Sequence, residues 1–426
     1  MPYASAHTEA KPIVKGWCPG ALTPMLSGDG LLMRAKILGS RLDLAQASEI
    51  AAIARDCGNG RIDLSQRAQL QLRGVTEETH GAAMARLDAI GLLARDPWRE
   101  AALNILASPA AGVADALTAR LAAALTRDEL HRRLPAKFLF LIDDGGPLGL
   151  AGVAADIRLE RHGDGIAVVA DGARDVAAIC AADAAVDAAA SLAQAFVAFR
   201  KERAFERRRM RAMVGEIGVE PLFRAAGLDA SPYRSDCVSS CVADALAPRA
   251  RGESGVLCVA APFGRMTAAQ FAGLVDAARR AGCSELRLTP WRAIAAPLSG
   301  ADAATQLREV ARDFGFIVEP DDPRLAIVAC PGAPECSQAQ GETRTDIERL
   351  APLARRLAPH GVGVHVSGCA KGCALPFPAP ATLIAGAHGG FDLVFDGEAG
   401  AAPMGFGRNL SEIEALLGAR LEGTQG

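Results

Sequence analysis

CPGAPEC, residues 330–336, and HVSGCAKGC, residues 365–373, hold four of the eleven cysteines of this chain. Each pair lies among glycine and proline residues, which are typical of turns, so their side chains can converge. The pairs have the spacings C-x5-C and C-x3-C, with 32 residues between them. Four thiolates from two turns can hold a [4Fe–4S] cluster. We therefore predict that this cluster is ligated by Cys330, Cys336, Cys369 and Cys373.

Two other roles are open to these cysteines. Buried small residues and a structural zinc site also use cysteine. Zinc sites favour pairs with two to four intervening residues, so C-x5-C fits zinc poorly. His365 precedes Cys369 by four residues, and two roles stay open for it: contact with a cluster or substrate, or a backbone hydrogen bond within a strand.

The composition excludes several classes of protein. With 426 residues, 50% hydrophobic and 22% charged, the chain is expected to be globular with several domains. A net charge of −3 gives no reason to expect nucleic-acid binding. No apolar run approaches the roughly 20 residues of a membrane span. The first residues, MPYASAHTEAKP, lack a secretion signal, so we expect a cytoplasmic protein with reduced cysteines.

The sequence contains an internal duplication. LDLAQASEIAAIARDCG, residues 42–58, followed by GRIDL resembles TAAQFAGLVDAARRAGC, residues 267–283, followed by SELRL. NILASPAAG, residues 104–112, likewise resembles AIVACPGAP, residues 326–334. The offset stays between 222 and 226 along much of the chain. We infer two copies of one unit, each a smaller β-α-β-α part followed by a larger α/β part.

The paired cysteines belong to the second copy alone. The first copy has Ser108 in place of Cys330, and Asp143 and Asp144 near the place of Cys369. A purely structural role would not predict paired turn cysteines in one of two similar folds. CVSSC, residues 237–241, is a further C-x3-C pair with no partner pair, and an ordinary structural role is expected there.

A basic stretch in the first copy is a candidate binding site. In SQRAQLQLRGV, residues 65–75, strand alternation would place Arg67, Gln69, Gln71 and Arg73 on one face. Guanidinium groups grip carboxylates bidentately, which suits a polycarboxylate ligand; a solvent-facing edge is the alternative. Lys36 adds a basic group on another strand-like run of the same copy. The predicted substrate-binding residues are Arg67, Arg73, Gln69, Arg34 and Lys137.

The two cysteine motifs resemble those of the sirohaem-dependent nitrite and sulfite reductases. That superfamily is also internally duplicated, with the cluster in the second copy, and its last cysteine bridges to the sirohaem iron, a role that would fall on Cys373. Its arginine-bearing T-x-R-Q-like strand matches SQRAQ through Arg67. A narrower resemblance is to the precorrin-3B synthase family, through WCPGALTPMLSGDGLLMR (17–34), SQRAQLQLRG, LPAKFLFLIDDGG (134–146) and APFGRM (261–266).

The chain departs from the reductase pattern where those enzymes hold their anionic substrate. Ala136 and Leu139 replace two basic residues, although Lys137 remains, and Leu103 replaces the arginine before Asn104. Reduction of sulfite or nitrite needs positive charge around the anion. These departures therefore favour the precorrin-3B synthase family.

That resemblance implies a monooxygenase of aerobic cobalamin biosynthesis. It would hydroxylate precorrin-3A at C20 and form a γ-lactone, using O2 and an external electron donor, either NAD(P)H through a reductase or a ferredoxin. A non-haem iron is left open as a second cofactor. The first alternative is a sirohaem-dependent sulfite or nitrite reductase, the one case that calls for sirohaem. The second is an iron–sulfur electron carrier or redox sensor.

The resemblance also implies an α+β fold with pseudo-twofold symmetry, made of two ferredoxin-like half-domains and two larger α/β domains. The expected segments are a disordered tail (1–14), the first half-domain (15–98), the first α/β domain (99–194), a basic helical connector (195–254), the second half-domain (255–320) and the second α/β domain (321–426).

Overall fold

The structure is a computed structural model that describes residues 18–94, 96–110, 112–127, 129–202, 209–247, 255–298, 300–387 and 389–423. The tail predicted for residues 1–14 and parts of the predicted connector lie outside these ranges. The described residues form two compact units. The smaller unit contains Ser27–Asp29 and Asp321–Gly426. The larger unit contains Trp17–Leu26 and Gly30–Pro320. Within the described part, no helix is long and apolar enough to cross a membrane.

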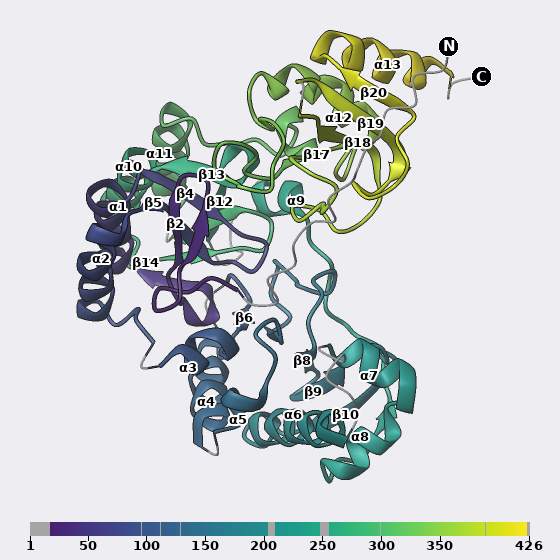
Figure 1. Ribbon diagram of the computed structural model, residues 1–426. Helices are drawn as coiled ribbons and strands as arrows, with labels where there is room; N and C mark the ends of the chain where they lie inside the picture. The colour runs from purple at the N-terminus through teal and green to yellow at the C-terminus, as the bar shows by residue number, and fades with distance from the viewer. Residues whose placement is uncertain are drawn as a thin grey trace. The chain divides into compact units, whose positions relative to one another are not determined.

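Two antiparallel sheets in the larger unit each contain strands from both copies (Figure 1). The first has the order β1 (Met25–Ser27), β2 (Gly30–Arg34), β5 (Leu70–Val75), β4 (Arg61–Leu64) and β13 (Arg265–Thr267). The second has the order β12 (Val256–Ala260), β15 (Ala293–Pro297), β14 (Glu285–Leu288) and β3 (Arg41–Asp43). Thus β13 of the second copy completes the first sheet, and β3 of the first copy completes the second.

Each exchanged strand leads directly into a helix. β3 precedes α1 (Leu44–Cys57), and β13 precedes α10 (Ala268–Arg280). Both helices begin with a capping box, in which the side chains of the N-cap residue and of a glutamine three residues later satisfy each other's backbone amides. The pairs are Asp43 with Gln46 and Thr267 with Gln270. The predicted duplication is therefore visible at the level of individual caps.

The two half-domains share one hydrophobic core. Ile50 and Leu72 from the first copy lie in the same buried cluster as Phe271 and Leu286 from the second. Helices α1 and α10 pack against each other (Figure 1), and α2 (Glu77–Ala89) and α11 (Ala301–Asp313) pack beside them. The ferredoxin-like half-domains and the α+β class expected from the sequence are confirmed.

The two larger parts have the same sheet topology. In each sheet the first three strands are parallel and the following strands antiparallel. The first-copy strands are β6 (Ile105–Ala107), β7 (Phe140–Asp143), β8 (Ile157–His162), β9 (Gly165–Ala170) and β10 (Val176–Cys180), with β11 (Ser231–Pro232) added at the edge. The second-copy strands are β16 (Ile327–Ala329), β17 (Val364–Ser367), β18 (Ala379–Ala385), β19 (Phe391–Gly397) and β20 (Gly405–Arg408).

Helices accompany these sheets. The first-copy helices are α3 (Pro97–Ala102), α4 (Val113–Arg127), α5 (Leu130–Arg133), α6 (Ala185–Glu202), α7 (Met210–Ile217) and α8 (Glu220–Ala225). α9 (Val242–Leu246) precedes β12, and the second-copy sheet has α12 (Ala351–Leu357) and α13 (Leu410–Gly423).

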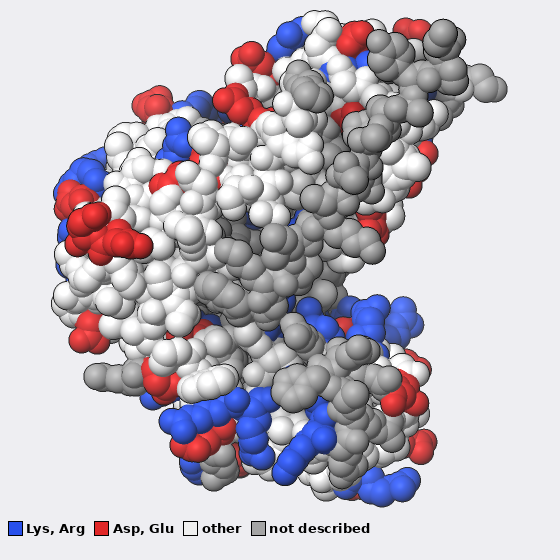
Figure 2. Space-filling view, viewed as in Figure 1, with Lys and Arg blue, Asp and Glu red and all other residues white. Residues whose placement is uncertain are grey.

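Part of the basic segment between the copies is built into the first α/β core. Met213 of α7 and Leu222 of α8 are buried in the same cluster as Phe196 of α6. Figure 2 shows lysine and arginine side chains gathered over the region of α5 and α6, where Arg132 and Lys201 are exposed. The apolar faces of these helices fix them in the core, and their basic side chains remain in solvent.

Buried ion pairs hold the exchanged strands. Asp63 of β4 accepts from Arg265 of β13 at 2.7 and 3.0 Å, and Arg73 lies 3.5 Å from the same carboxylate. In the second sheet, Glu285 of β14 pairs with Arg41 of the exchanged strand β3. Glu285 also lies 2.5 Å from Arg287, which pairs with Asp115 of α4 at 2.7 and 2.9 Å. Because these charges are largely shielded from water, removing one partner leaves the other poorly solvated.

We predict that Arg287→Met lowers the free energy of unfolding of the larger unit by about 3 kcal/mol, because Glu285 and Asp115 lose the buried cation that they share and Glu285 keeps only the more exposed Arg41. Urea denaturation followed by circular dichroism measures the loss. The matched control is Arg279→Met, which breaks the exposed pair with Asp276 and should cost less than about 1 kcal/mol. Equal losses in the two variants would contradict this account of the exchanged strands.

Candidate functional site

The two cysteine loops of the smaller unit leave neighbouring parallel strands at the same edge of one sheet. Cys330 directly follows β16, and Cys369 comes two residues after the end of β17. β16 and β17 pair in parallel from Ile327 with Val364 to Ala329 with Val366. Because parallel strands end on the same side, the turns that follow them meet there, as at many ligand sites of α/β sheets.

Backbone hydrogen bonds join the two loops. The amide of Cys330 donates to Val366 O at 3.1 Å, and that of Gln340 donates to Gly368 O at 2.7 Å. Within the first loop, the Cys336 amide donates to Gly332 O at 2.8 Å, which closes a turn around the first cysteine pair. These contacts hold the loops together through the main chain, so the cysteine side chains can meet a ligand.

The four thiols lie within electrostatic range of one another. Cys330 is buried, and the Gly368 amide donates to its Sγ at 3.1 Å. A hydrogen bond from the Cys373 thiol lowers the pKa of Cys330 to about 6; burial opposes this shift, and the Gly368 amide adds to it. The same hydrogen bond raises the pKa of Cys373, an exposed residue. Burial is the main cause that raises the pKa of Cys369, with further contributions from Cys330 and Cys336.

Among the described residues, no three His, Cys, Asp or Glu side chains are grouped around a single metal-ion position. His365 is fully buried in β17, and its Cε1 lies 3.7 Å from the place of a Cβ on Gly372. The ring therefore lies beside Gly372, which stands between Cys369 and Cys373 in the sequence of the second cysteine loop.

The corresponding edge in the first copy carries side chains with oxygen atoms in place of thiols. Ser108 follows β6 and Asp143 ends β7, with Ser108 Oγ 3.5 Å from Asp143 Oδ1. The amides of Leu150 and Gly145 donate to the Asp143 carboxylate at 2.6 and 3.2 Å. Burial raises the pKa of this carboxyl group. A hydrogen-bonded acid thus occupies the place that the cysteines take in the second copy.

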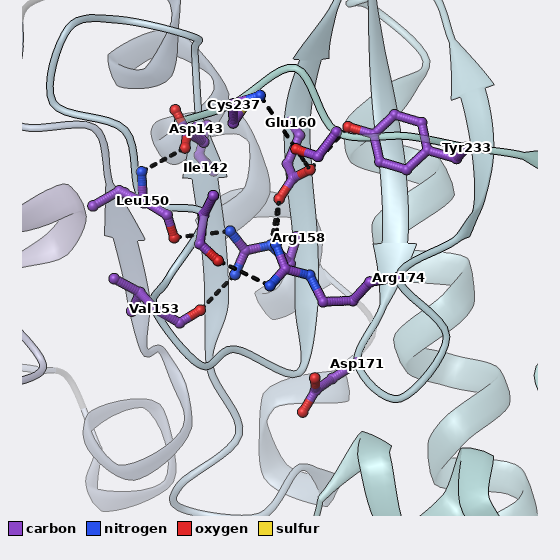
Figure 3. Close-up of polar contacts among 12 residues, drawn as sticks. Ile142, Asp143, Leu150, Val153, Arg158, Glu160, Asp171, Arg174, Tyr233 and Cys237 are labelled. Atoms are coloured by element: carbon purple, nitrogen blue, oxygen red, sulfur yellow. Dashed lines mark hydrogen bonds and ion pairs between the residues drawn. The ribbon is translucent and has the colours of Figure 1, made fainter. Parts of the chain in front are cut away.

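A polar network extends from this first-copy edge (Figure 3). Glu160 is buried and accepts from Tyr233 Oη at 2.8 Å and Ser235 Oγ at 2.6 Å, and it pairs with Arg158. Burial, followed by the charge of Asp143, raises the pKa of Cys237 to about 12.

A basic pocket lies at the end of β2 in the larger unit. Its lining residues are Cys18, Pro19, Gly20, Arg34, Lys36, Glu100, Ala101 and Asn104. Arg67 Nη1 lies 4.0 Å from Cys18 Sγ, and Cys18 also acts on Arg34 by charge and by a side-chain hydrogen bond. Burial, followed by repulsion from Arg34, lowers the pKa of Lys36 to about 7. Three basic side chains therefore approach one thiol.

Glu100 and Asn104 line this pocket and are held by hydrogen bonds to the backbone and to Lys36. The Glu100 carboxylate accepts from the backbone amides of Ala21 and Leu22 at 2.6 and 3.1 Å. Asn104 accepts from Lys36 Nζ at 2.9 Å and donates to the carbonyls of Ala101 and Ala136. The sequence did not identify Cys18, Glu100 and Asn104 as parts of a pocket. Asn104 was noted only as the residue after Leu103, where the reductases have an arginine before the asparagine.

The predicted substrate-binding residues take different places. Arg67 lies in the turn before β5, beside Ala68 with a φ of +50°, so the strand alternation expected from residue 65 begins later, at Leu70. Gln69 uses its amide on the backbone of Ile37 at 3.0 and 2.8 Å, and Arg73 is buried beside Asp63. Lys137 is exposed. Of the five, Arg34 and Arg67 come together at Cys18.

The departures from the reductase pattern are structural as well as chemical. Leu103 and Leu139 are buried apolar residues, each with 5% of its surface exposed. The carbonyl of Ala136 accepts from the Asn104 side chain at 3.0 Å. Leu103 and Leu139 pack in the interior and Ala136 contributes a backbone hydrogen bond, whereas basic residues at these positions would add positive charge.

Comparisons with known proteins agree on the family. Residues 23–90 and 249–297 match the model for the nitrite/sulfite reductase ferredoxin-like half domain. A precorrin-3B synthase from Sinorhizobium sp is 31% identical over 410 residues, which cover 92% of this chain and 85% of that protein. Sulfite reductase [ferredoxin] 2 from Mycolicibacterium paratuberculosis is 23% identical over 383 residues, with coverages of 80% and 67%.

The fold matches a solved structure. The NirA protein of Mycobacterium tuberculosis superposes with a TM-score of 0.69 at 22% identity, over 89% of this chain and 77% of that one. This likeness confirms the duplicated α+β fold that the sequence predicted.

We predict that Lys36→Met changes the pH dependence of stability. The pKa of the Lys36 amine is 10.5 in the unfolded chain and about 7 in the folded one. Between these values the unfolded state binds one more proton, so wild-type stability should rise with pH relative to the variant, by up to about 1.4 kcal/mol per pH unit. Denaturant midpoints at pH 7 and pH 9 measure this difference.

Lys137→Met is the control for this pH experiment, because it removes an exposed ammonium and reports any general effect of net charge. The effect seen in Lys137→Met is subtracted first. If the difference in unfolding free energy between wild type and Lys36→Met is then the same at pH 7 and pH 9, the burial of Lys36 is contradicted.

Proposed function

The chain belongs to the precorrin-3B synthase family, and we propose that it is a monooxygenase that converts precorrin-3A to its C20-hydroxylated γ-lactone with O2 and reducing equivalents. The observation that supports this most is the 31% identity over 92% of the chain to a precorrin-3B synthase. The second support is the set of four cysteines at one sheet edge of the second copy.

We assign Cys330, Cys336, Cys369 and Cys373 as ligands of a [4Fe–4S] cluster. The donor set fits, because it consists of four thiols on two hydrogen-bonded loops, with the Gly368 amide at Cys330 Sγ. A cube places each cysteine on a different iron, so its ligands need not surround one point as the ligands of zinc do. When bound, the cluster would supply single electrons to the reaction.

We assign Arg34 and Arg67 to the carboxylates of the substrate. Precorrin-3A is rich in carboxylates, and two guanidinium groups beside Cys18 can form charge-assisted hydrogen bonds with them. An arriving carboxylate would also favour the protonated form of Lys36, whose pKa in the folded chain is about 7. Lys137 stays a candidate at the surface, whereas Gln69 and Arg73 would act through the backbone and the carboxylate that they contact.

The remaining parts of the proposal concern partners and location. Electrons would come from outside the chain, through a ferredoxin or an NAD(P)H-dependent reductase, and the enzyme would work in the cytoplasm. A non-haem iron could serve oxygen activation, but no residue is assigned to it.

Sulfite or nitrite reduction is the alternative function favoured by the more distant sulfite reductase relatives. The apolar Leu103 and Leu139 weigh against it, because a small anion needs positive charge around it. Sirohaem absorption bands in the purified protein would support this alternative. An electron carrier needs only a small cluster domain, so a chain of 426 residues with a basic pocket argues against that role.

We predict that the anaerobically purified protein, given precorrin-3A, reductant and oxygen, forms the hydroxylated lactone, as detected by mass spectrometry. Cys330→Ser should lose iron and activity together, because the buried thiol is a ligand. Cys237→Ser is the matched control and should keep both. Intact cluster absorption with no product would overturn the proposed reaction, and full iron content in Cys330→Ser would overturn the ligand assignment.

We predict that Arg67→Met weakens the binding of precorrin-3A about tenfold to a hundredfold, because a hydrogen bond to a charged group contributes about 1.5–3 kcal/mol. Fluorescence or absorption titration under anaerobic conditions measures the dissociation constant. Arg280→Met, which removes an exposed arginine of α10, is the matched control. An unchanged dissociation constant in Arg67→Met would remove this residue from the substrate site.

A further inference from the structure

The turn between β1 and β2 contacts the first cysteine loop within the smaller unit. This turn, Ser27–Asp29, belongs to that unit although it lies about 300 residues earlier in the chain. Ser27 Oγ donates a hydrogen bond to Glu335 O, and the Gly28 amide donates to the same oxygen at 3.2 Å. One carbonyl therefore accepts two hydrogen bonds from the turn.

That carbonyl belongs to the peptide group that leads into Cys336. The nitrogen of the same peptide group is the Cys336 amide, which donates to Gly332 O at 2.8 Å. Both ends of the peptide group are thus hydrogen-bonded, one to the Ser27–Gly28 turn and the other within the cysteine loop. The orientation of this group determines where the Cys336 thiol can point.

Gly28 makes this contact possible because it has no side chain. A Cβ at this position would lie 1.8 Å from Pro334 O, a main-chain atom that cannot move aside by rotation. Any larger residue would therefore push the turn and the cysteine loop apart. The SGDG sequence of the turn is thus matched to the CPGAPEC loop by close backbone packing.

We propose that Ser27 and Gly28 are positioning residues for the iron–sulfur cluster. The two residues hold the Glu335–Cys336 peptide group, and in this way they affect how tightly the cluster is retained and what reduction potential it has. This inference rests on the cluster assignment within the proposed function. Groups that orient metal ligands typically change metal affinity by about 10–100-fold when they are removed. The potential of a cluster also depends on the charge around it, because the reduced cluster carries one more negative charge. The two donors to Glu335 O offset the partial negative charge of a carbonyl that is bonded to the Cys336 nitrogen.

Gly28→Ala and Ser27→Ala test this inference in the full-length protein. Gly28→Ala should lose its cluster to a chelator at least about tenfold faster than wild type. Ser27→Ala leaves room for the loop and removes one donor from Glu335 O, so its cluster should assemble normally but show a more negative midpoint potential. Iron analysis, chelator-driven bleaching and a redox titration followed by electron paramagnetic resonance provide these measurements.

The control is Gly361→Ala in the same unit, where a Cβ would meet nothing within 4 Å. It should match wild type in cluster retention and potential. Wild-type retention in Gly28→Ala together with an unchanged potential in Ser27→Ala would overturn the inference, as would a Cys330→Ser variant that keeps its iron. If wild type holds a cluster but does not oxidise precorrin-3A, the proposed reaction fails, whereas the potentials still decide the role of this turn.

Discussion

The exchange of two short strands between the copies is the constraint on which the larger unit depends. β13 pairs with β4, and β3 pairs with β14, so neither half-domain sheet is complete without residues from the other copy. Buried pairs such as Asp63 with Arg265 join an exchanged strand to its neighbour in the sheet. A single hydrophobic core receives side chains from both copies. Neither half-domain can therefore bury its apolar face alone, which is a physical reason for both copies to remain in one chain.

With the scaffold shared in this way, the two α/β parts can differ in chemistry while they keep one topology. At the edge where β6 and β7 end, the first copy has Ser108 and Asp143, and backbone amides satisfy the carboxylate. At the edge where β16 and β17 end, the second copy has two loops with four thiols. The equivalent sheet edge thus carries a hydrogen-bonded carboxylate in the first copy and a candidate cluster site in the second.

Much of the architecture was predictable because duplicated sequence preserves local rules. Matching helix, strand and turn segments recur at a nearly constant offset, and they indicated the repeated unit correctly; the shared capping boxes of α1 and α10 agree with it. The placement of the four cysteines in two turns was predictable because glycine and proline surround them, whereas their role as cluster ligands stays a prediction. The exchange of β3 and β13 was not predictable, because three-residue strands carry too little pattern to identify their partners.

The basic site was predicted only in part, for a similar reason. Strand alternation was assumed from residue 65, but Ala68 takes a left-handed φ and the strand starts at Leu70, so Arg67 points from a turn. Gln69 and Arg73 looked available in sequence, yet their side chains contact Ile37 and Asp63. The sequence shows that a residue is polar, but it does not show whether its side chain already bonds to the backbone or to a buried charged group.

Isotope labelling tests the central claim, that this duplicated iron–sulfur fold oxygenates a tetrapyrrole. The purified enzyme would be supplied with precorrin-3A, reductant and ¹⁸O-labelled dioxygen, and the product analysed by mass spectrometry. The account predicts one labelled oxygen atom in the product, and none when the label is in water. Product labelled from water, or formed without oxygen, would contradict it.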